Sequence, residues 1–424
     1  METPRQLSIT DANPASVTQD KLTRRAFLGM GSAALMVAGM VPSLLAAGSE
    51  KTDRSRSNPG PHNPSLDSQN PDSVTPPGTD TGGVPTFKYP FSFANKRLYE
   101  GGWSREITIR ELPISRSMAG VNMRLTAGGV RELHWHTAGE WAIMLYGTAR
   151  ITAIDSDGRS FVSDVKKNDL WYFPAGIPHS IQGLEPDGAE FLLVFDDGNF
   201  SEFGTVLLST SMAHTPREVL SKNFAVAEQA FAGLPNEELF IFQAEVPGAL
   251  EADRNAAAGS LGKSVRDFAF RPADFPAIKR TKGGEVRIID SSTFKVSTSI
   301  AAAIVTVRPG GLRELHWHPN ADEWQYFVSG KGRMTLLATG NRSRTMDFEA
   351  GDVGYVPQTL LHYVENTGDT DLVFLEMFKA GAYQDFSLSQ WLAHTPPELV
   401  MAHLHIDRPT YDAIPKDETV IMPA

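Results

Sequence analysis

The chain has 424 residues, enough for two or three domains, and its 41% apolar and 21% charged residues are typical of a globular protein. It contains no cysteine, which excludes disulfides, cysteine nucleophiles and thiolate metal sites, so any metal must be held by histidine and carboxylate. The net charge of -11, without a basic stripe, argues against nucleic acid as a partner.

The first 47 residues have the pattern of an export signal. Arg24 and Arg25 precede an apolar run, 29–47, that is rich in Gly, Ala and Met and ends in small residues. This pattern resembles a twin-arginine signal peptide and implies export by the twin-arginine translocase to the periplasm or the cell exterior. A membrane anchor is the alternative, but the run is short and contains Pro42. We therefore expect no stable membrane insertion after signal cleavage.

The rest of the chain contains a linker and an internal repeat. Residues 48–85 are rich in Ser, Pro, Asp, Asn and Gly, which predicts a flexible linker. The sequence Arg-Glu-Leu-His-Trp-His occurs at 131–136 and again at 313–318. This repeat indicates a duplicated domain, and we expect an N-terminal domain at 86–235 and a C-terminal domain at 236–424.

Short alternating or continuous apolar stretches, separated by turn signals, predict β-strands in both halves. The predicted strands are 121–126, 149–155, 160–165, 170–173 and 190–195, then 302–307, 323–328, 332–338, 353–356 and 372–378. Many short strands without strand-helix-strand spacing predict an all-β fold of two tandem jelly-roll barrels. After each barrel an Ala-His-Thr-Pro segment predicts a helix, with Thr215 and Thr395 as N-caps.

Each half also contains three histidines and one glutamate in the same order. His134 and His136 share one face of a strand, and a short turn brings Glu140 back on the adjacent strand. His179 follows on a later strand. The second set consists of His316, His318, Glu323 and His362. Three imidazoles and a carboxylate leave two positions open on an octahedral ion, and the carboxylate favours Mn or Fe over Cu.

With these residues the chain resembles the bicupins, proteins with two cupin barrels in tandem. The first cupin motif is matched by Gly128, His134, His136, Glu140 and Gly147, and by Gly310, His316, His318, Glu323 and Gly330. Over roughly residues 85–410 the chain is similar to the manganese oxalate decarboxylases, carboxy-lyases of this group. The resemblance implies two Mn²⁺ ions per chain, oxalate as substrate, dioxygen as co-catalyst, and formate and CO2 as products. It also implies a homo-oligomer, a trimer or hexamer.

The resemblance assigns roles to three further residues near the metal ligands. Arg131 and Arg313 would hold a substrate carboxylate at the first and the second site, because a guanidinium binds a carboxylate bidentately. Strict alternation aims Arg131 away from the face of His134, so its inward direction requires a bend before the strand. Glu202, on a loop beside the first site, matches the proton donor of the family.

Other features leave alternatives open. Glu376 matches a carboxylate near the second metal, with Tyr383 beside it, and this second site either stabilises the fold, relays electrons or does little chemistry. The loop of Glu202 departs from the family at Phe203 and Gly204, where small polar residues are usual. Since oxidation is expected when protonation fails, an oxalate oxidase that releases hydrogen peroxide is the alternative function. A metal-binding storage bicupin and another cupin enzyme, such as a ring-cleaving dioxygenase, are further alternatives.

Overall fold

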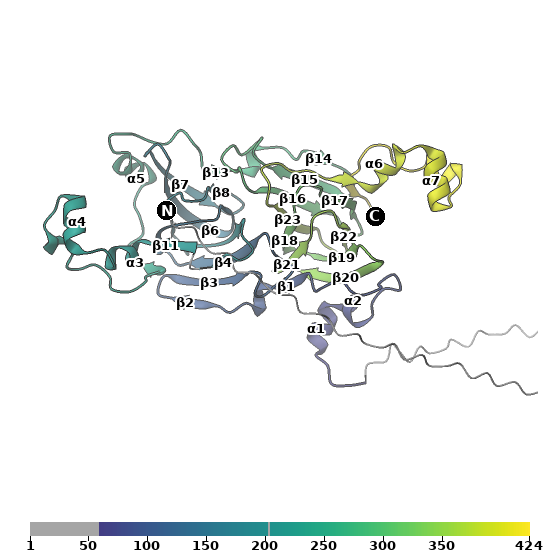
Figure 1. Ribbon diagram of the computed structural model, residues 1–424, viewed down its shortest axis with the longest axis horizontal. Coiled ribbons are helices and arrows are strands. Elements are labelled where there is room, and N and C mark those ends of the chain that lie inside the picture. Colours follow the sequence, from purple (N-terminus) through teal and green to yellow (C-terminus); the bar gives the residue numbers. More distant parts are fainter. Residues whose placement is uncertain (1–58, 202–203) are drawn as a thin grey trace, which may run out of the picture. The chain divides into compact units, whose positions relative to one another are not determined.

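The computed structural model describes residues 59–201 and 204–424, which form two β-barrels with short helices beside them (Figure 1). The predicted signal peptide and Glu202 lie outside these residues. Within the described ranges, no helix combines the length and the apolar character that crossing a membrane requires. The prediction of an all-β fold with two tandem barrels is confirmed.

The N-terminal barrel consists of two facing layers of antiparallel strands. One layer contains β5 (Gly129–His136), β7 (Ser160–Lys166), β9 (His179–Gly183), β11 (Thr205–Leu207) and β12 (Ile241–Gln243). The other contains β2 (Arg97–Tyr99), β3 (Gly102–Ile107), β4 (Ala119–Leu125), β8 (Leu170–Phe173), β10 (Ala189–Phe195) and β13 (Ala269–Phe270). The long strand β6 (Glu140–Ile154) belongs to both, because its first half pairs with β8 and β10 and its second half with β7 and β9.

The C-terminal barrel repeats this arrangement. One layer contains β17 (Leu312–Trp317), β19 (Lys331–Ala338), β20 (Arg342–Glu349), β22 (Leu361–Asn366), β24 (Phe386–Ser387) and β25 (Ile421–Met422). The facing layer contains β1 (Lys88–Pro90), β14 (Lys279–Arg280), β15 (Gly284–Ile289), β16 (Ala301–Val307), β18 (Glu323–Ser329), β21 (Asp352–Val356) and β23 (Leu372–Phe378). All ten predicted strands are present, because each has enough apolar residues to bury one or both faces.

A third apolar cluster joins the two barrels, in addition to the core inside each of them. At its centre Trp141, Tyr172, Trp324 and Tyr355 are at most 1% exposed. Burying one such ring stabilises the folded state by about 4 kcal/mol, from the apolar area removed from water. Residues 59–424 therefore form one compact unit rather than two separable domains.

Strands cross the predicted boundary between the two domains. β1, from the expected N-terminal domain, pairs with β21 of the C-terminal barrel. In the other direction, β12 and β13 pair with β5 and β8 of the N-terminal barrel. The strand pairing thus crosses residue 235 in both directions, and the position of the boundary between the domains stays a prediction. The sequence repeat could not indicate this exchange, because it marks the common core of the barrels and not their closing strands.

Residues 59–85 differ from the expected flexible linker. They contain α1 (Pro64–Gln69) and α2 (Pro71–Val74), and the Asn63 side chain caps α1. The backbone N–H of Asp72 donates to Asp347 on β20 (2.9 Å), and Asp80 accepts from the backbone N–H of Thr345 (2.8 Å). The polar composition therefore serves to cover the edge strand of the C-terminal barrel.

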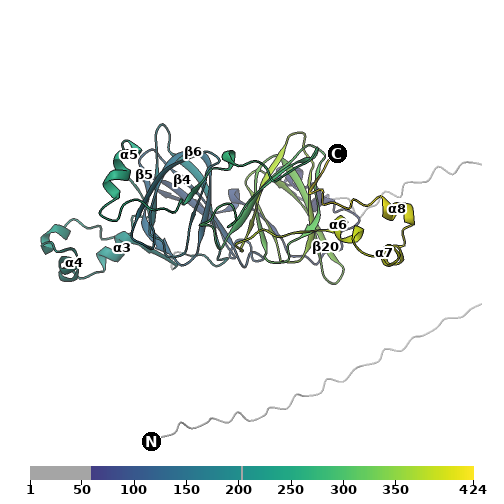
Figure 2. The same ribbon diagram turned by 90° about the horizontal axis from the view of Figure 1, so that it is seen from above.

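The remaining helices surround the barrels. They are α3 (Leu208–Ala213), α4 (Arg217–Phe224), α5 (Leu250–Ala257), α6 (Leu388–Ala393), α7 (Pro397–Leu404) and α8 (Arg408–Asp412), with 3₁₀ turns η2 (Phe91–Phe93), η4 (Glu228–Phe231) and η5 (Pro272–Asp274). Figure 2 shows α4 and α7 beyond the barrels on opposite sides. The helices predicted after each barrel are present, but their caps differ from the prediction. Thr215 and Thr395 donate to carbonyl oxygens of the preceding helices, and Pro216 and Pro396 are the N-caps.

Candidate metal centres

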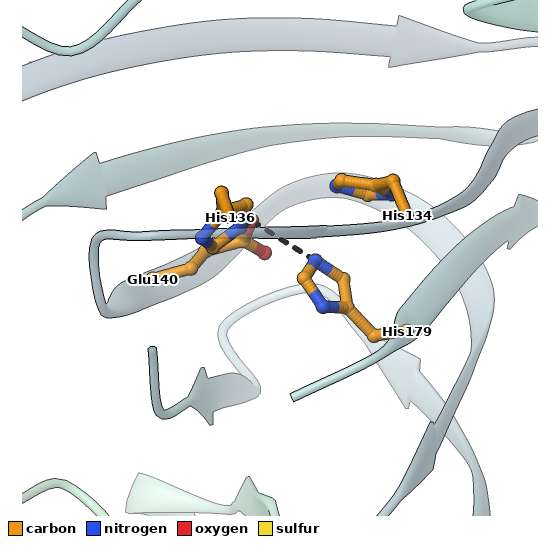
Figure 3. Close-up of side chains that lie close together, drawn as sticks. All are labelled: His134, His136, Glu140 and His179. Atoms are coloured by element: carbon orange, nitrogen blue, oxygen red, sulfur yellow. Dashed lines mark hydrogen bonds and ion pairs between the residues drawn. The ribbon is translucent and has the colours of Figure 1, made fainter. Parts of the chain in front are cut away.

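The first candidate centre lies between the two layers of the N-terminal barrel (Figure 3). His134 and His136 come from β5, His179 from β9 and Glu140 from the start of β6. Their ligand atoms all lie within 4.8 Å of one another, and the four residues are at most 3% exposed. Glu140 is not on a strand adjacent to β5, as predicted, but in the facing layer. This position lets its carboxylate meet the imidazoles across the barrel interior.

Backbone carbonyl groups fix the orientation of the three imidazoles. The Nδ1 atoms of His134, His136 and His179 donate to the carbonyl oxygens of Glu132 (2.6 Å), Ala138 (2.6 Å) and Ile177 (2.8 Å). Each Nε2 lone pair is therefore left for the centre, as in metal-binding histidines. Nε2 of His179 is buried and has no hydrogen-bond partner, which fits a bound cation.

The carboxylate of Glu140 is held at both oxygens. Oε2 lies 3.2 Å from Nε2 of His136 and 3.5 Å from Nε2 of His179, while Oε1 accepts a hydrogen bond from Trp171 Nε1 (3.1 Å). Burial alone would raise the pKa of Glu140, but the two histidines outweigh it and hold the pKa far below its usual range. Burial, with Arg131 nearby, lowers the pKa of His134. Ionised carboxylate and neutral imidazole are the forms that bind a metal.

The second centre repeats this arrangement in the C-terminal barrel. Its ligands are His316, His318, Glu323 and His362, with ligand atoms within 4.8 Å of one another and at most 2% exposure. The three Nε2 atoms and Glu323 Oε2 are buried and face one another, with Oε2 2.8 Å from Nε2 of His362 and 3.2 Å from Nε2 of His318. Four such atoms converging on one point would destabilise the fold unless they shared a cation. The structure thus brings together all eight residues predicted to bind metal.

The hydrogen-bond donor to the ligand carboxylate differs between the two centres. In the first barrel it is the indole of Trp171, which pairs with Ala142 across the strands. In the second barrel it is the amide of Gln325 (2.6 Å), which pairs with Gly354. A large residue thus stands opposite a small one in both barrels, on opposite strands. These donors were not predicted from the sequence, although the Ala-to-Gln difference two residues after each glutamate was a signal.

Both arginines reach their centres through an irregularity in the strand. The register of β5 on β9 shifts between Arg131 and His134, and that of β17 on β22 shifts between Arg313 and His316. An extra residue in one strand turns the preceding side chain to the other face. This is the bend that an inward Arg131 was expected to require.

The guanidinium of Arg131 is available to a ligand. The residue is 5% exposed, Nη1 donates to the Phe240 carbonyl (3.2 Å), and the charge lies 3.9 Å above the Phe240 ring. Across 59–201 and 204–424, no carboxylate forms an ion pair with it. Burial lowers its pKa to about 10, so it remains charged at neutral pH. Arg131 and three metal ligands, His134, His136 and Glu140, line a cavity of about 30 Å³.

The guanidinium of Arg313 is already neutralised. Nε lies 3.3 Å from Glu376 Oε1, and Nη2 donates to Tyr383 Oη (2.8 Å) and to Asp385 Oδ2 (2.8 Å). Burial raises the pKa of Glu376 to about 7. The predicted group of Arg313, Glu376 and Tyr383 is thus brought together, and Asp385, which was not predicted from the sequence, completes it.

The described residues on both sides of Glu202 lie at the first centre. Phe200 stacks on Phe195 with ring centroids 3.7 Å apart and lines the cavity of Arg131. Thr205 pairs with His136 in the β-sheet, and the carbonyl of Gly204 accepts from the backbone N–H of Thr137 (3.0 Å).

Comparisons with known proteins agree with this architecture. The cupin family model matches residues 92–231 and 269–412. The chain is 52% identical to oxalate decarboxylase OxdC of Bacillus subtilis over 84% of this chain and 92% of that protein. It is 40% identical to a probable oxalate decarboxylase of Arthroderma benhamiae, over 86% and 90% of the two chains. A solved structure of the B. subtilis enzyme at pH 4.6 superposes with a TM-score of 0.82 at 51% identity, over 86% and 94% of the chains. The protein belongs to the cupin family and, within it, to the bicupin oxalate decarboxylases.

Proposed function

We propose that the protein is a manganese-dependent oxalate decarboxylase that converts oxalate to formate and CO2. The observation that carries this proposal is Arg131, a buried cation without a carboxylate partner in the described chain, beside a centre of three histidines and Glu140. Relatives named oxalate decarboxylase match most of the chain, and the B. subtilis enzyme has Mn(II) centres. We therefore propose one Mn²⁺ at each of the two centres.

The residues of the first centre suit a substrate with two carboxylates. A bound Mn²⁺ would supply a Lewis acid and, with dioxygen as co-catalyst, a reversible electron acceptor. Arg131 would bind the far carboxylate and keep its charge in place. The reaction breaks the C–C bond of hydrogen oxalate, releases CO2 and returns the proton to the remaining carbon as formate. We propose Glu202 as the group that accepts and returns this proton.

The second centre serves a different purpose in this proposal. Arg313 is bound by Glu376 and Asp385, so a substrate carboxylate would have to displace an existing ion pair. We propose that turnover occurs at the first centre, and that Arg313 and Glu376 stabilise the second.

The residues of the two centres disfavour two of the alternative functions. A ring-cleaving dioxygenase would need a large apolar pocket, whereas Arg131, Glu106 and Glu140 place charges in the lining of this cavity. A storage bicupin would not need a complete set of ligands, and all eight are present. An oxalate oxidase remains the alternative, because Phe203 and Gly204 alter the loop of Glu202.

We also propose that the protein is exported and oligomeric. The twin-arginine pattern in residues 1–47 supports export to the periplasm or the cell exterior. Large apolar side chains are exposed on the helices that follow each barrel, which supports a trimer or hexamer. They are Val219 (46% exposed), Phe224 (51%), Trp391 (58%), Leu399 (59%) and Leu404 (44%).

The test is a product analysis on protein folded in the cytoplasm and analysed for metal. Oxalate is supplied with dioxygen at mildly acidic pH, and formate and hydrogen peroxide are measured together. We expect mostly formate, and its loss in Glu202→Ala and Glu202→Gln. Peroxide as the main product would make the protein an oxalate oxidase. Neither product, with both centres holding Mn²⁺, would refute oxalate as the substrate.

A further inference from the structure

Two matching hydrogen bonds connect the barrels beside the metal centres. Tyr172, on β8, is 2.7 Å from the Oγ of Ser299, which precedes β16 of the other barrel. Tyr355, on β21, is 2.8 Å from the Oγ of Ser117, which precedes β4 of the first barrel. The two tyrosines are equivalent, because each pairs with the tryptophan that follows the metal-binding glutamate. Each barrel thus receives a serine hydroxyl from the other.

At the first centre this hydroxyl belongs to a chain of hydrogen bonds that reaches the turn between two metal ligands. Ser299 Oγ donates to Asp196 Oδ2 (2.5 Å), and Asp196 Oδ1 accepts from the backbone N–H of Gly139 (2.8 Å). The backbone N–H of Asp196 also donates to the Gly139 carbonyl (3.4 Å). Gly139 belongs to the short turn that joins His136 to Glu140. Asp196 therefore holds this turn on both sides, and Ser299 holds Asp196.

A side chain at Gly139 could not replace this contact without displacing its neighbours. A Cβ on Gly139 would lie 2.8 Å from Ser299 Oγ and 2.8 Å from Tyr172 Oη, which is closer than real Cβ contacts allow. The carboxylate that holds the turn comes instead from Asp196, at the end of β10, and Ser299 bonds to it from outside the N-terminal barrel.

At the second centre the turn provides its own carboxylate. Asp322, directly before Glu323, accepts from Tyr355 Oη (2.5 Å) and from the backbone N–H of Gln358 (2.7 Å). Ser117 contacts only Tyr355 in this network, through its hydroxyl and its backbone N–H. Loss of the Ser117 hydroxyl would leave both bonds of Asp322 intact. The two serines are thus equivalent in position, but only Ser299 bonds to the carboxylate that holds the turn of its centre.

We propose that Ser299 of the C-terminal barrel is a positioning residue of the N-terminal metal centre. Through Asp196 it fixes the turn 137–139 and hence the geometry of His136 and Glu140 around the ion. Partners behind the direct ligands commonly set metal affinity, because they determine how well the ligand atoms converge. The first centre is then incomplete without the second barrel.

The test compares Ser299→Ala with the matched control Ser117→Ala, in the full chain loaded with Mn²⁺. Both variants remove one hydroxyl between the barrels, so we expect similar small decreases in melting temperature. Release of Mn²⁺ to a chelator is followed over time, and the phase that is absent from His179→Ala identifies the first centre. We expect Ser299→Ala to release this ion about tenfold faster, and Ser117→Ala to leave it unchanged. Ser299→Thr, which keeps the hydroxyl, should restore slow release.

Two results would overturn the proposal. One is unchanged release from the first centre in Ser299→Ala, whether or not Asp196→Asn releases its ion faster. The other is equally faster release from both centres in both serine variants, which would mean that the hydroxyls only hold the barrels together. The metal readout does not depend on the proposed function. If no variant and no wild-type protein acts on oxalate, the function fails while faster release in Ser299→Ala still supports this inference.

Discussion

Leu193 and Glu376 occupy the same position in the two barrels, and only Glu376 carries a charge. Each pairs with the residue two places after the metal-binding glutamate of its own barrel. Glu376 lies 3.3 Å from the guanidinium of Arg313, whereas Leu193 lines the cavity beside Arg131. This difference, together with Asp385 in the second half, leaves a cation available in one half and neutralised in the other.

Placing a carboxylate at residue 193 should inactivate the first centre. In Leu193→Glu the new carboxylate would pair with Arg131 and compete with the substrate, and kcat/KM for oxalate should fall by about 100-fold. Leu193→Gln has the same size without the charge and should lose far less. Steady-state kinetics on metal-loaded protein checks this, and an equal loss in both variants would show that shape and not charge is responsible.

Arg131 should be needed for oxalate but not for the metal. Arg131→Lys keeps the charge but loses the two-pronged geometry, so we expect kcat/KM to fall by about 10- to 100-fold. The metal content should remain at two ions per chain, because Arg131 is not a ligand. Metal analysis alongside kinetics separates the two effects, and loss of an ion in this variant would assign the residue a structural role instead.

Arg313 should matter for stability. Arg313→Met would leave Glu376 and Asp385 in the interior without their partner, which costs about 3–5 kcal/mol of unfolding free energy. Adding Asp385→Asn should recover part of this loss, because Asp385 has the lowered pKa of the two acids and is the one left charged without a partner. Urea unfolding of the single and double variants measures it. An unfolding free energy equal to that of the wild type would mean that water already screens this group.

Each metal should be removable on its own. Glu140→Gln and Glu323→Gln should each bind one Mn²⁺ instead of two, because each changes one ligand of one centre. Removing both ions with a chelator should lower the melting temperature, since a ligand at 100 times its Kd stabilises the folded state by about 2.7 kcal/mol per site. Metal analysis and thermal unfolding check both points, and two ions retained in Glu140→Gln would argue against its role as a ligand.

Asp347 should make stability depend on pH. It lies buried under α2, and burial raises its pKa from 3.8 to about 6. Because the folded state binds the proton more tightly, the stabilisation is complete below about pH 4 and is lost as the pH rises to about 6. Asp347→Asn removes this titration, so the difference in unfolding free energy between wild type and variant should change by about 1–2 kcal/mol over that range. Parallel pH profiles would contradict the assignment.

The parts of the fold that the sequence predicted are those with local signals. The run Leu170–Phe173 is buried along its whole length, and the predicted strand is present without change as β8. In contrast, β20 was missed because Arg342, Arg344 and Asp347 make it read as polar. Its polar side chains contact residues 72–86, which lie far away in the sequence. Contacts of this kind leave no trace in a local pattern.

In the candidate site, too, the features with a local sequence signal were predicted and those without one were not. Spacing alone identified all eight ligands, because the strand period and the repeat constrain them together. The donors Trp171 and Gln325 were missed, because each is defined by its partner across the strands, Ala142 or Gly354. The position of Glu140 in the facing layer was missed for a related reason: a short turn in sequence can lead either to a neighbouring strand or across the barrel.

The exchange of strands between the barrels also sets an order of events during synthesis. β1 cannot pair until β21, which ends at Val356, has left the ribosome, so residues 59–90 must wait while nearly the whole chain is made. Eleven residues separate this segment from the end of the proposed signal peptide at residue 47. A translocase that accepts folded proteins recognises the signal peptide. The segment that follows shortly after this peptide would dock only once the second barrel has formed.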